Sequence, residues 1–327
     1  MLVHRRPFLR QTALLAAAGF LAVPSPPTLA APSGAAPSNA APARRFTMSL
    51  DPGAIGVQVG QLELMQLAAQ HGFEAITPYP SFLADQNQQA LTDLLSGLQE
   101  KNLVWGVAGL PVEFRKDEAK FKADLAELPR LAKALQNAKG SRMSTWIMPT
   151  HAELNYLKNF RQHVDRLQQV AQVLGEHNIR LGLEYVGPKT LRDRDKYAFV
   201  ATLEETRALI DEVGQPNVGV VLDSFHWYTA EETIDDILTL TNREVVACDL
   251  NDAHRGRAPR EQIDGERELP LTTGIIPTKK FLQALIKINY DGPVRAEPFN
   301  QTLNEMNVQA AVATTTKAMQ QAFDLVS

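Results

Sequence analysis

Residues 217–228 read NVGVVLDSFHWY, and this stretch contains the pattern that decides the fold. The run VGVVL shows no polar alternation, which is typical of a strand buried on both faces in a parallel sheet. Asp223 ends the run, and His226 follows three residues later. In α/β barrels the reactive side chains lie at the carboxyl ends of the strands and in the loops that follow. The stretch therefore predicts a barrel strand whose functional end is at Asp223.

Three other strand-like runs also end in acidic residues. They are IRLGLEYV with Glu184, EVVACDLND with Asp249 and Asp252, and GPVRAEPF with Glu297. Alternation along a strand allows Glu184, Asp223, Asp249 and Glu297 to face the barrel axis while apolar neighbours face the helices. Arg180 and Arg295 are the polar exceptions in this pattern, and we expect them to pair with acids at the bottom of the barrel. The four strands together predict one cluster of carboxylates.

The order of elements indicates a (β/α)8 TIM barrel that forms a single domain over residues 46–327. Strand-like runs occupy 46–50, 73–80, 103–112, 144–150, 179–186, 218–225, 244–250 and 292–299. Helical patterns follow at 61–72, 87–101, 117–138 and 156–177, from about 202, 230 and 278, and at 304–326. Thr202 begins a Thr-Leu-Glu-Glu capping box. A doubly wound sheet is the alternative, but no Gly-rich phosphate turn opens the first helix.

The N-terminal residues precede the predicted barrel. Arg5, Arg6, Phe8 and Leu9 match the pattern of a twin-arginine export signal, and the apolar segment after them is short for a membrane span. We expect a signal peptide at residues 1–30 and a Pro/Ala-rich linker at 31–45, with cleavage after Ala30 or Ala43. The signal predicts a periplasmic or secreted protein with no stable membrane association after cleavage; an uncleaved membrane tail is the alternative.

Composition limits the partners and the chemistry. The 327 residues carry a formal net charge of −4, which gives no electrostatic reason to bind nucleic acid. Cys248 is the one cysteine, so no internal disulfide forms, and its place in an apolar strand predicts a buried structural thiol. We expect a small molecule as the partner, and the sequence leaves a homo-oligomer open.

The segment between Asp252 and Thr278 is long, polar and rich in turn residues. It leaves the carboxyl end of the seventh strand, so in a barrel it lies over the site, where Arg267 is a candidate for gripping substrate oxygens. His151, Lys189 and Trp227 are further candidates for substrate binding, Trp227 through stacking of its ring on a sugar.

Carboxylates that converge in a barrel mouth are unstable unless they are paired or bound to a cation. One divalent ion is therefore the expected cofactor. Oxygen ligands suit Mn²⁺ or Mg²⁺, and a histidine ligand shifts the preference toward Mn, Co or Zn. Manganese is the ion we expect first.

From about residue 46 to its end, the chain resembles the xylose isomerase-like barrel superfamily of sugar isomerases and epimerases. In the ketose 3-epimerase branch four ligands occur in the order Glu, Asp, His, Glu. Glu184 in LGLEYV, Asp223 in VVLDSFH and Glu297 in RAEPF match the first, second and fourth. Asp249 in CDLND stands where the histidine is expected, so the resemblance implies the metal set Glu184, Asp223, Asp249 and Glu297, with His254 as a substitute third ligand.

The resemblance also implies a mechanism. Glu184 and Glu297 are expected to be the acid/base pair that moves a proton α to a carbonyl through an enediolate, with His226 stabilising the developing oxyanion. The sequence therefore predicts a metal-dependent sugar isomerase or epimerase acting on a keto-sugar or derivative.

Several alternatives remain at this point. The same site in an exported enzyme would also suit a lyase that performs β-elimination on a 3-keto-glycoside. A metal-free two-carboxylate glycosidase and a non-catalytic periplasmic sugar binder stay open because Asp249 departs from the family pattern. A barrel endonuclease is disfavoured, since the chain has only seven histidines.

Overall fold

The computed structural model describes residues 43–327, so the predicted export signal and most of the predicted linker lie outside the described residues. The strands are β1 Thr47–Leu50, β2 Ala75–Ile76, β3 Val104–Trp105, β4 Ala108–Gly109, β5 Arg142–Ile147, β6 Thr150–His151, β7 Arg180–Tyr185, β8 Tyr197–Ala198, β9 Val218–Asp223, β10 Val245–Leu250 and β11 Pro293–Ala296. The α-helices are α1 Gln61–Gln70, α2 Pro80–Ala84, α3 Gln88–Glu100, α4 Glu118–Asn137, α5 Tyr156–Glu176, α6 Lys189–Arg192, α7 Leu203–Val213, α8 Ser224–Thr229, α9 Ile234–Leu238, α10 Thr278–Lys287, α11 Gln301–Asn304 and α12 Val308–Asp324. Two 3₁₀ turns, η1 Gly53–Ile55 and η2 Pro259–Glu261, complete the set.

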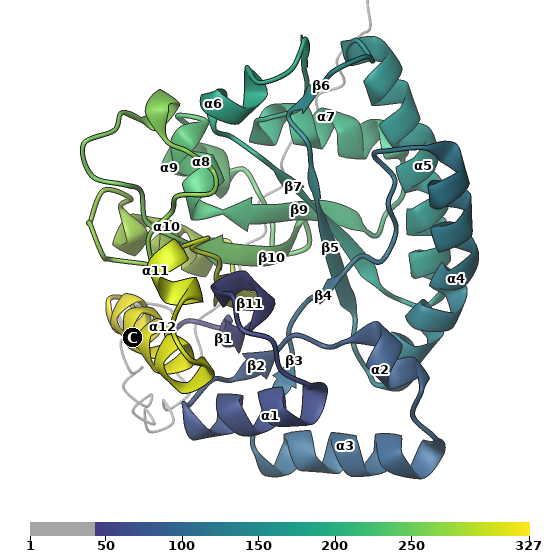
Figure 1. The fold of residues 1–327 in the computed structure, drawn as a ribbon, viewed down its shortest axis with the longest axis vertical. Helices are drawn as coiled ribbons and strands as arrows, with labels where there is room; N and C mark the ends of the chain where they lie inside the picture. The colour runs from purple at the N-terminus through teal and green to yellow at the C-terminus, as the bar shows by residue number, and fades with distance from the viewer. Residues whose placement is uncertain (1–42) are drawn as a thin grey trace, which may run out of the picture. The chain divides into compact units, whose positions relative to one another are not determined.

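Nine strands form one parallel sheet in the order β3-β2-β1-β11-β10-β9-β7-β5-β4. The two ends of this order, β3 and β4, are separated in the chain only by Gly106 and Val107, so they are two halves of one barrel strand. Eight strands therefore close into a ring surrounded by helices (Figure 1). The predicted (β/α)8 barrel is confirmed.

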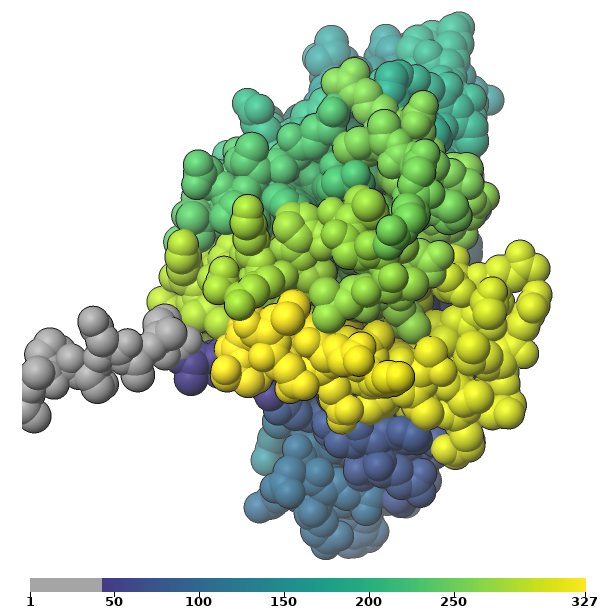
Figure 2. Space-filling view, turned by 90° about the vertical axis from the view of Figure 1, so that its left-hand side faces the viewer, coloured from purple at the N-terminus to yellow at the C-terminus, as the bar shows by residue number. Residues whose placement is uncertain are grey.

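The first and last strands lie side by side, because β1 pairs with β11 through Met48 and Val294. In the space-filling view the yellow C-terminal segment forms a band between the blue N-terminal part of the barrel and the green middle part of the chain (Figure 2). Near this seam Arg44 donates to both oxygens of Glu74, at 2.9 and 2.8 Å.

The strand residues divide into two cores, as the predicted alternation requires. A large core between the strands and the helices contains the outward-facing strand residues Leu181, Leu183, Val220, Leu222, Cys248, Leu250, Val294 and Ala296. A separate small core inside the barrel consists of Val107, Val221 and Ala247. In this inner core Val221 and Ala247 lie two residues before Asp223 and Asp249, and Val221 is level with Glu184.

The two arginines behave differently from each other. Arg180 lies at the bottom of the barrel, where its Nη2 donates to the carbonyl oxygens of Arg243 and Val245. Its partners are therefore backbone carbonyls, which corrects the expected pairing with acids. Arg295 does pair with acids, but at the level of the candidate site and not at the bottom.

Helix starts follow local side-chain chemistry. The Thr202 side chain accepts a hydrogen bond from the Glu205 amide, as a helix N-cap does. The Glu205 carboxylate accepts from the Ala201 amide, one residue before the position that a full capping box requires. The helix expected from about residue 230 is instead two short helices, α8 and α9, and α8 begins directly after Asp223.

Among the residues described, no helix is both long enough and apolar enough to cross a bilayer.

Gly219 on β9 offers a test of the barrel packing. A methyl carbon added there would overlap the Glu244 carbonyl oxygen, which is backbone and has no room to move aside. We expect Gly219→Ala to lower the free energy of unfolding by about 1–3 kcal/mol, as overpacking does. Chemical denaturation measures this loss. Gly109→Ala on β4 is the matched control, since nothing lies within 4 Å of its added carbon; equal stability of the two variants would contradict the packing described.

Candidate active site

Four carboxylates meet at the carboxyl ends of neighbouring strands. Glu184 lies on β7, Asp223 ends β9, Asp249 lies on β10 and Glu297 follows β11 directly. Each offers an oxygen, and these oxygens all lie within 4.8 Å of one another. All four side chains are buried. We call these four residues the acid cluster.

Glu184 is the member with the fewest partners. It is 7% exposed, and its Oε1 has no hydrogen-bond partner. Burial raises the pKa of this carboxyl well above its ordinary value of 4.5, and repulsion from Glu297, Asp249 and Asp223 raises it further. An unpartnered buried oxygen that points into a group of carboxylates is what a ligand or a cation would satisfy.

Asp223 serves two purposes. Its Oδ1 accepts hydrogen bonds from the amides of Phe225 and His226, at 2.5 and 3.3 Å, so it also caps α8. Its Oδ2 accepts from Asn251 at 2.9 Å and from Arg267 at 2.9 Å. Burial raises its pKa to about 6, and the Arg267 guanidinium opposes that rise.

Asn251, immediately after β10, connects two members of the acid cluster. Its amide nitrogen donates to Asp223, and its Oδ1 accepts from the Glu297 backbone amide at 3.0 Å. Its own backbone amide donates to Ser224 Oγ at 2.8 Å. This side chain fixes the spacing between Asp223 and the backbone that carries Glu297.

Two guanidiniums contact the cluster, that of Arg267, which is buried, and that of Arg295, which is partly buried. Arg267 Nη1 lies 2.9 Å from Asp223 Oδ2 and 3.2 Å from Glu297 Oε2. Arg295 binds Asp249 through Nε at 2.7 Å and Glu297 Oε1 through Nη2 at 3.1 Å. Burial raises the pKa of Glu297 to about 8, although both arginines act to lower it.

The charges do not balance within this group. Four carboxylates face two guanidiniums, so two negative charges remain uncompensated if all four are ionised. Asp51, which binds Arg295, and Asp264, which binds Arg267 at 2.7 Å, add further negative charge at the edge. Converging carboxylate oxygens, the unpartnered Glu184 oxygen and this excess charge fit one divalent cation.

His226 lies in the same site, on α8. Its Nδ1 is 3.3 Å from the Gly187 amide, and its Nε2 is 3.1 Å from Arg267 Nη2 and 3.6 Å from Glu184 Oε1. Burial lowers its pKa to about 3, and the Arg267 charge acts in the same direction. The imidazole is therefore neutral at neutral pH, next to a candidate acid/base group.

The loop after β10 does cover the site, as its length predicts. Arg267 reaches inward from it and is buried. Asp252, at the root of the loop, accepts four backbone hydrogen bonds, from Ala253 and Ile276 on Oδ1 and from Thr273 and Gly274 on Oδ2. Asp252 thus holds the loop in place and takes no part in the acid cluster.

Among the described residues, three predicted substrate contacts make no hydrogen bond or ion pair with the acid cluster. Trp227 is buried, donates through Nε1 to the Thr233 carbonyl oxygen and packs edge-on against Phe281. Its ring faces the helix layer, which corrects the idea that it stacks on a sugar. Lys189 pairs with Asp193 on α6. His151 lies on β6, where Nδ1 accepts from the amides of Glu153 and Leu154, so that Nε2 carries the hydrogen of the neutral ring.

An aromatic residue that the sequence analysis missed lies at the mouth. Trp146 on β5 pairs in register with Glu184 on β7, so both side chains lie on the axial face of the sheet. Trp146 is 39% exposed, and Arg115 lies over its ring at 4.4 Å. The alternation along β5 contained this signal, because Trp146 follows Ser144, the partner of Gly182, by two residues.

Cys248 is buried, as predicted, and the pKa of its thiol is raised well above the ordinary value by burial. It is therefore not a nucleophile.

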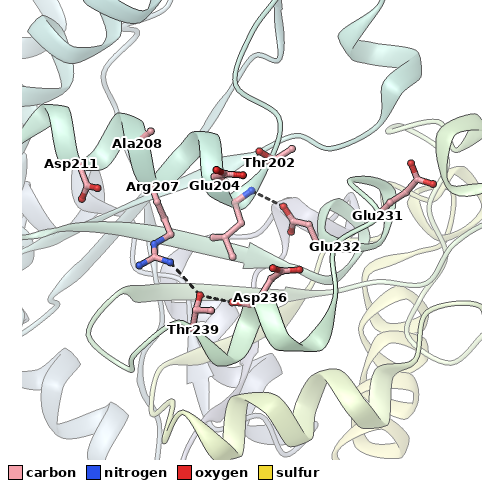
Figure 3. A pocket seen from close by; sticks show the side chains of 10 residues that line it. Thr202, Glu204, Arg207, Ala208, Asp211, Glu231, Glu232, Asp236 and Thr239 are labelled. Carbon is pink, nitrogen blue, oxygen red and sulfur yellow. Dashed lines mark hydrogen bonds between the residues drawn. The ribbon is translucent and has the colours of Figure 1, made fainter.

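A separate cavity of about 620 Å³ lies between α7 and α9 (Figure 3). Glu232 reaches its wall, where it accepts hydrogen bonds from the Leu203 amide at 2.6 Å and from Tyr185 at 2.5 Å. No member of the acid cluster lines this cavity.

Glu232 makes folding stability depend on pH. Burial raises its pKa from 4.5 to about 7. Between these values the folded chain keeps a proton that the unfolded chain loses, so the contribution of Glu232 to stability falls as pH rises through this window. We expect Glu232→Gln to be more stable than the unchanged protein at pH 8 by about 1–3 kcal/mol, and by much less at pH 4.5.

Denaturant unfolding at both pH values measures this difference. Glu204→Gln is the control, since Glu204 lines the same cavity but is exposed (Figure 3). A constant stability difference for Glu232→Gln across the pH range would contradict the assignment.

Comparison with known proteins agrees with this geometry. A family model described as "Xylose isomerase-like TIM barrel" matches residues 65–322. An inosose isomerase of Bacillus subtilis (strain 168) is 23% identical over 157 residues, which are 48% of this chain and 53% of that enzyme. A ketose 3-epimerase of Arthrobacter globiformis is 27% identical over 147 residues, 45% of this chain and 43% of that one. The matched regions thus span about half the length of these relatives.

Solved structures match over most of the chain. A xylose isomerase domain protein from Alicyclobacillus acidocaldarius subsp. acidocaldarius has a TM-score of 0.75 and 29% identity, covering 86% of this chain and 99% of its own. The IolI protein, solved with a bound zinc atom, has a TM-score of 0.70 and 20% identity, with the same coverage. At that identity IolI supports the fold alone.

Proposed function

Because the chain belongs to the xylose isomerase-like TIM barrel family, whose curated members similar to it are sugar isomerases and epimerases, we propose that it is a divalent-metal-dependent sugar isomerase or epimerase. The observation that carries this proposal is the acid cluster, in which Glu184 has an unpartnered buried oxygen close to three other carboxylates.

The acid cluster would hold the cation, with manganese as the expected ion. When bound, such an ion polarises a carbonyl and its neighbouring hydroxyl and so acidifies the C–H between them. The excess negative charge left by the two arginines supports an ion of charge two.

Glu184 and Glu297 are the proposed acid/base pair. They come from β7 and from the end of β11, with β9 and β10 between them in the sheet, so they approach a bound substrate from different sides. One removes the proton α to the carbonyl, and the other returns a proton to the enediolate. Proton transfer by two positioned carboxyl groups of this kind is general acid–base catalysis.

His226 is the proposed group that stabilises the developing oxyanion. It is neutral and buried, and because Nδ1 accepts from the Gly187 amide, Nε2 carries the hydrogen that the ring would donate. Arg267 Nη2 is also a donor, so its 3.1 Å contact with Nε2 is not a hydrogen bond in this tautomer. Arg267 contacts His226, Asp223 and Glu297 at once and so fixes the positions of these side chains relative to one another.

The charges of the mouth favour an unphosphorylated substrate. Six carboxylates, the acid cluster with Asp51 and Asp264, surround two arginines that are already paired with them. A phosphate there would meet repulsion, whereas a neutral sugar would not. The exposed ring of Trp146 offers such a sugar an apolar surface. Export to the periplasm, proposed from Arg5 and Arg6, is consistent with a neutral or glycosidic substrate.

Deuterium exchange tests the proposed proton abstraction whatever the final product is. The manganese-loaded protein is incubated in D2O with a panel of unphosphorylated ketoses and keto-glycosides. We expect deuterium at the carbon next to the carbonyl, detected by mass spectrometry and NMR. Glu184→Gln and Glu297→Gln should each lower the exchange rate by about 10²–10⁴-fold, the usual contribution of general acid–base catalysis.

Glu176→Gln, on the exposed end of α5, is the control and should exchange at the normal rate. Near-normal exchange in Glu297→Gln would disprove its assigned role. Release of an aglycone from a keto-glycoside would redirect the proposal to the lyase that shares the same first step.

A further inference from the structure

Among its carboxylate partners, Arg295 makes the most contacts with Asp249. Its Nε lies 2.7 Å from Asp249 Oδ1, and its Nη2 lies 3.1 Å from Asp249 Oδ2. This two-point contact between a planar guanidinium and both carboxylate oxygens is the strongest geometry that such a pair adopts. Both charges of the pair are therefore compensated within the pair.

The backbone holds the two residues of the pair side by side. Asp249 and Arg295 lie opposite each other in register on the adjacent strands β10 and β11. Both side chains therefore leave the sheet on the same face and at the same level. Arg267 differs in this respect, because it reaches the acid cluster from the loop after β10 and divides its contacts among Asp223, Glu297, Asp264 and His226.

The remaining members of the acid cluster, together with Arg267, carry the negative charge that one divalent cation would neutralise. Once the Asp249–Arg295 pair is counted as neutral, Glu184, Asp223 and Glu297 carry three negative charges when all are ionised, as they would be around a cation, and Arg267 carries one positive charge. Two negative charges are then left, and the unpartnered oxygen of Glu184 lies among them.

We propose that Asp249 is the fixed counter-ion of Arg295 and not a metal ligand, and that a bound divalent cation is held by Glu184, Asp223 and Glu297. This inference rests on the proposed function, because it concerns the cation of the same site. It assigns Arg295 and Asp249 as positioning residues.

The pair positions Glu297 in particular. Arg295 Nη2 also donates to Glu297 Oε1 at 3.1 Å, and its Nη1 binds Asp51 at the end of β1. Asp249 holds the guanidinium in the plane from which it reaches Glu297. If Asp249 is removed alone, the full charge of Arg295 falls on Glu297 and Asp51, where it opposes a cation. If both are removed, that opposition disappears.

A double-mutant cycle separates the two roles of Asp249. Affinity for Mn²⁺ is measured by titration calorimetry on chelator-treated full chains, with elemental mass spectrometry for stoichiometry. The variants are Asp249→Asn, Arg295→Gln and the double variant, with Glu184→Gln as the reference for loss of a true ligand. Circular dichroism checks that each variant is folded.

We expect Asp249→Asn to bind manganese at least tenfold more weakly and Arg295→Gln to bind at least as tightly as the unchanged protein. The double variant should recover an affinity within about threefold of the unchanged protein, at one ion per chain. A double variant as weak as Glu184→Gln would overturn the proposal, because removing the charge of Arg295 does not replace a missing ligand oxygen.

The apolar pair Asp249→Leu with Arg295→Met provides a second version of the double variant. Replacement of a whole buried ion pair by apolar residues is tolerated better than removal of one partner. If either double variant folds and keeps the ion, the proposal stands. If the unchanged protein binds no divalent ion, both this inference and the proposed function fail; if it binds one but exchanges no deuterium, only the proposed function fails.

Discussion

Four carboxylates enclosed in one barrel mouth repel one another, and the surrounding structure is arranged so that most of that repulsion is compensated. Asp249 faces Arg295, Asp223 and Glu297 share Arg267, and Asn251 joins Asp223 to the backbone of Glu297. Glu184 alone keeps an oxygen with no partner. The two arginines therefore leave part of the negative charge of the acid cluster uncompensated. This residual charge is what would attract a cation.

The barrel supplies this arrangement through strand register. Asp249 is level with Asp223 on one side and with Arg295 on the other, and Glu184 is level with Val221, two residues below Asp223. The inner core of Val107, Val221 and Ala247 fills the barrel with apolar side chains at the level of Glu184 and below Asp223 and Asp249. The carboxylates therefore lie at the upper edge of an apolar layer.

The barrel and its four acids were predictable because they depend on local patterns. When apolar and polar residues alternate along a strand that ends in an acid, the sequence predicts both which face is buried and which end is functional. GPVRAEPF does this for Arg295 and Glu297. The same alternation predicted that Cys248 would face the helices, and it does. Even Trp146 was within reach of this reasoning, because its strand neighbour is Glu184.

The partners of the acids were harder to predict because they depend on contacts between distant segments. Arg267 is 44 positions from Asp223, and Arg295 is 244 positions from Asp51. Trp227 illustrates the opposite error, in which closeness in sequence to Asp223 and His226 suggested closeness in space. The helical turn of α8 rotates the two rings apart, so His226 enters the site and Trp227 enters the core.

The four amide contacts of Asp252 have a consequence for how this protein can change over time. They tie residues 273–276 to the end of β10, and the backbone pairing of Asp252 with Glu268 ties the segment just after Arg267 to the same point. The loop therefore has an anchored base that carries Arg267. Its outer arc, residues 254–264, is closed on itself by the buried Gln262, whose side chain bonds the backbone of His254 and Arg257. Substitutions on the outer surface of that arc can alter which substrates fit the mouth, while the four acids stay in place because they lie on the strands or directly after one. Selectivity and reactivity are thus inherited on separate elements, the loop and the strands.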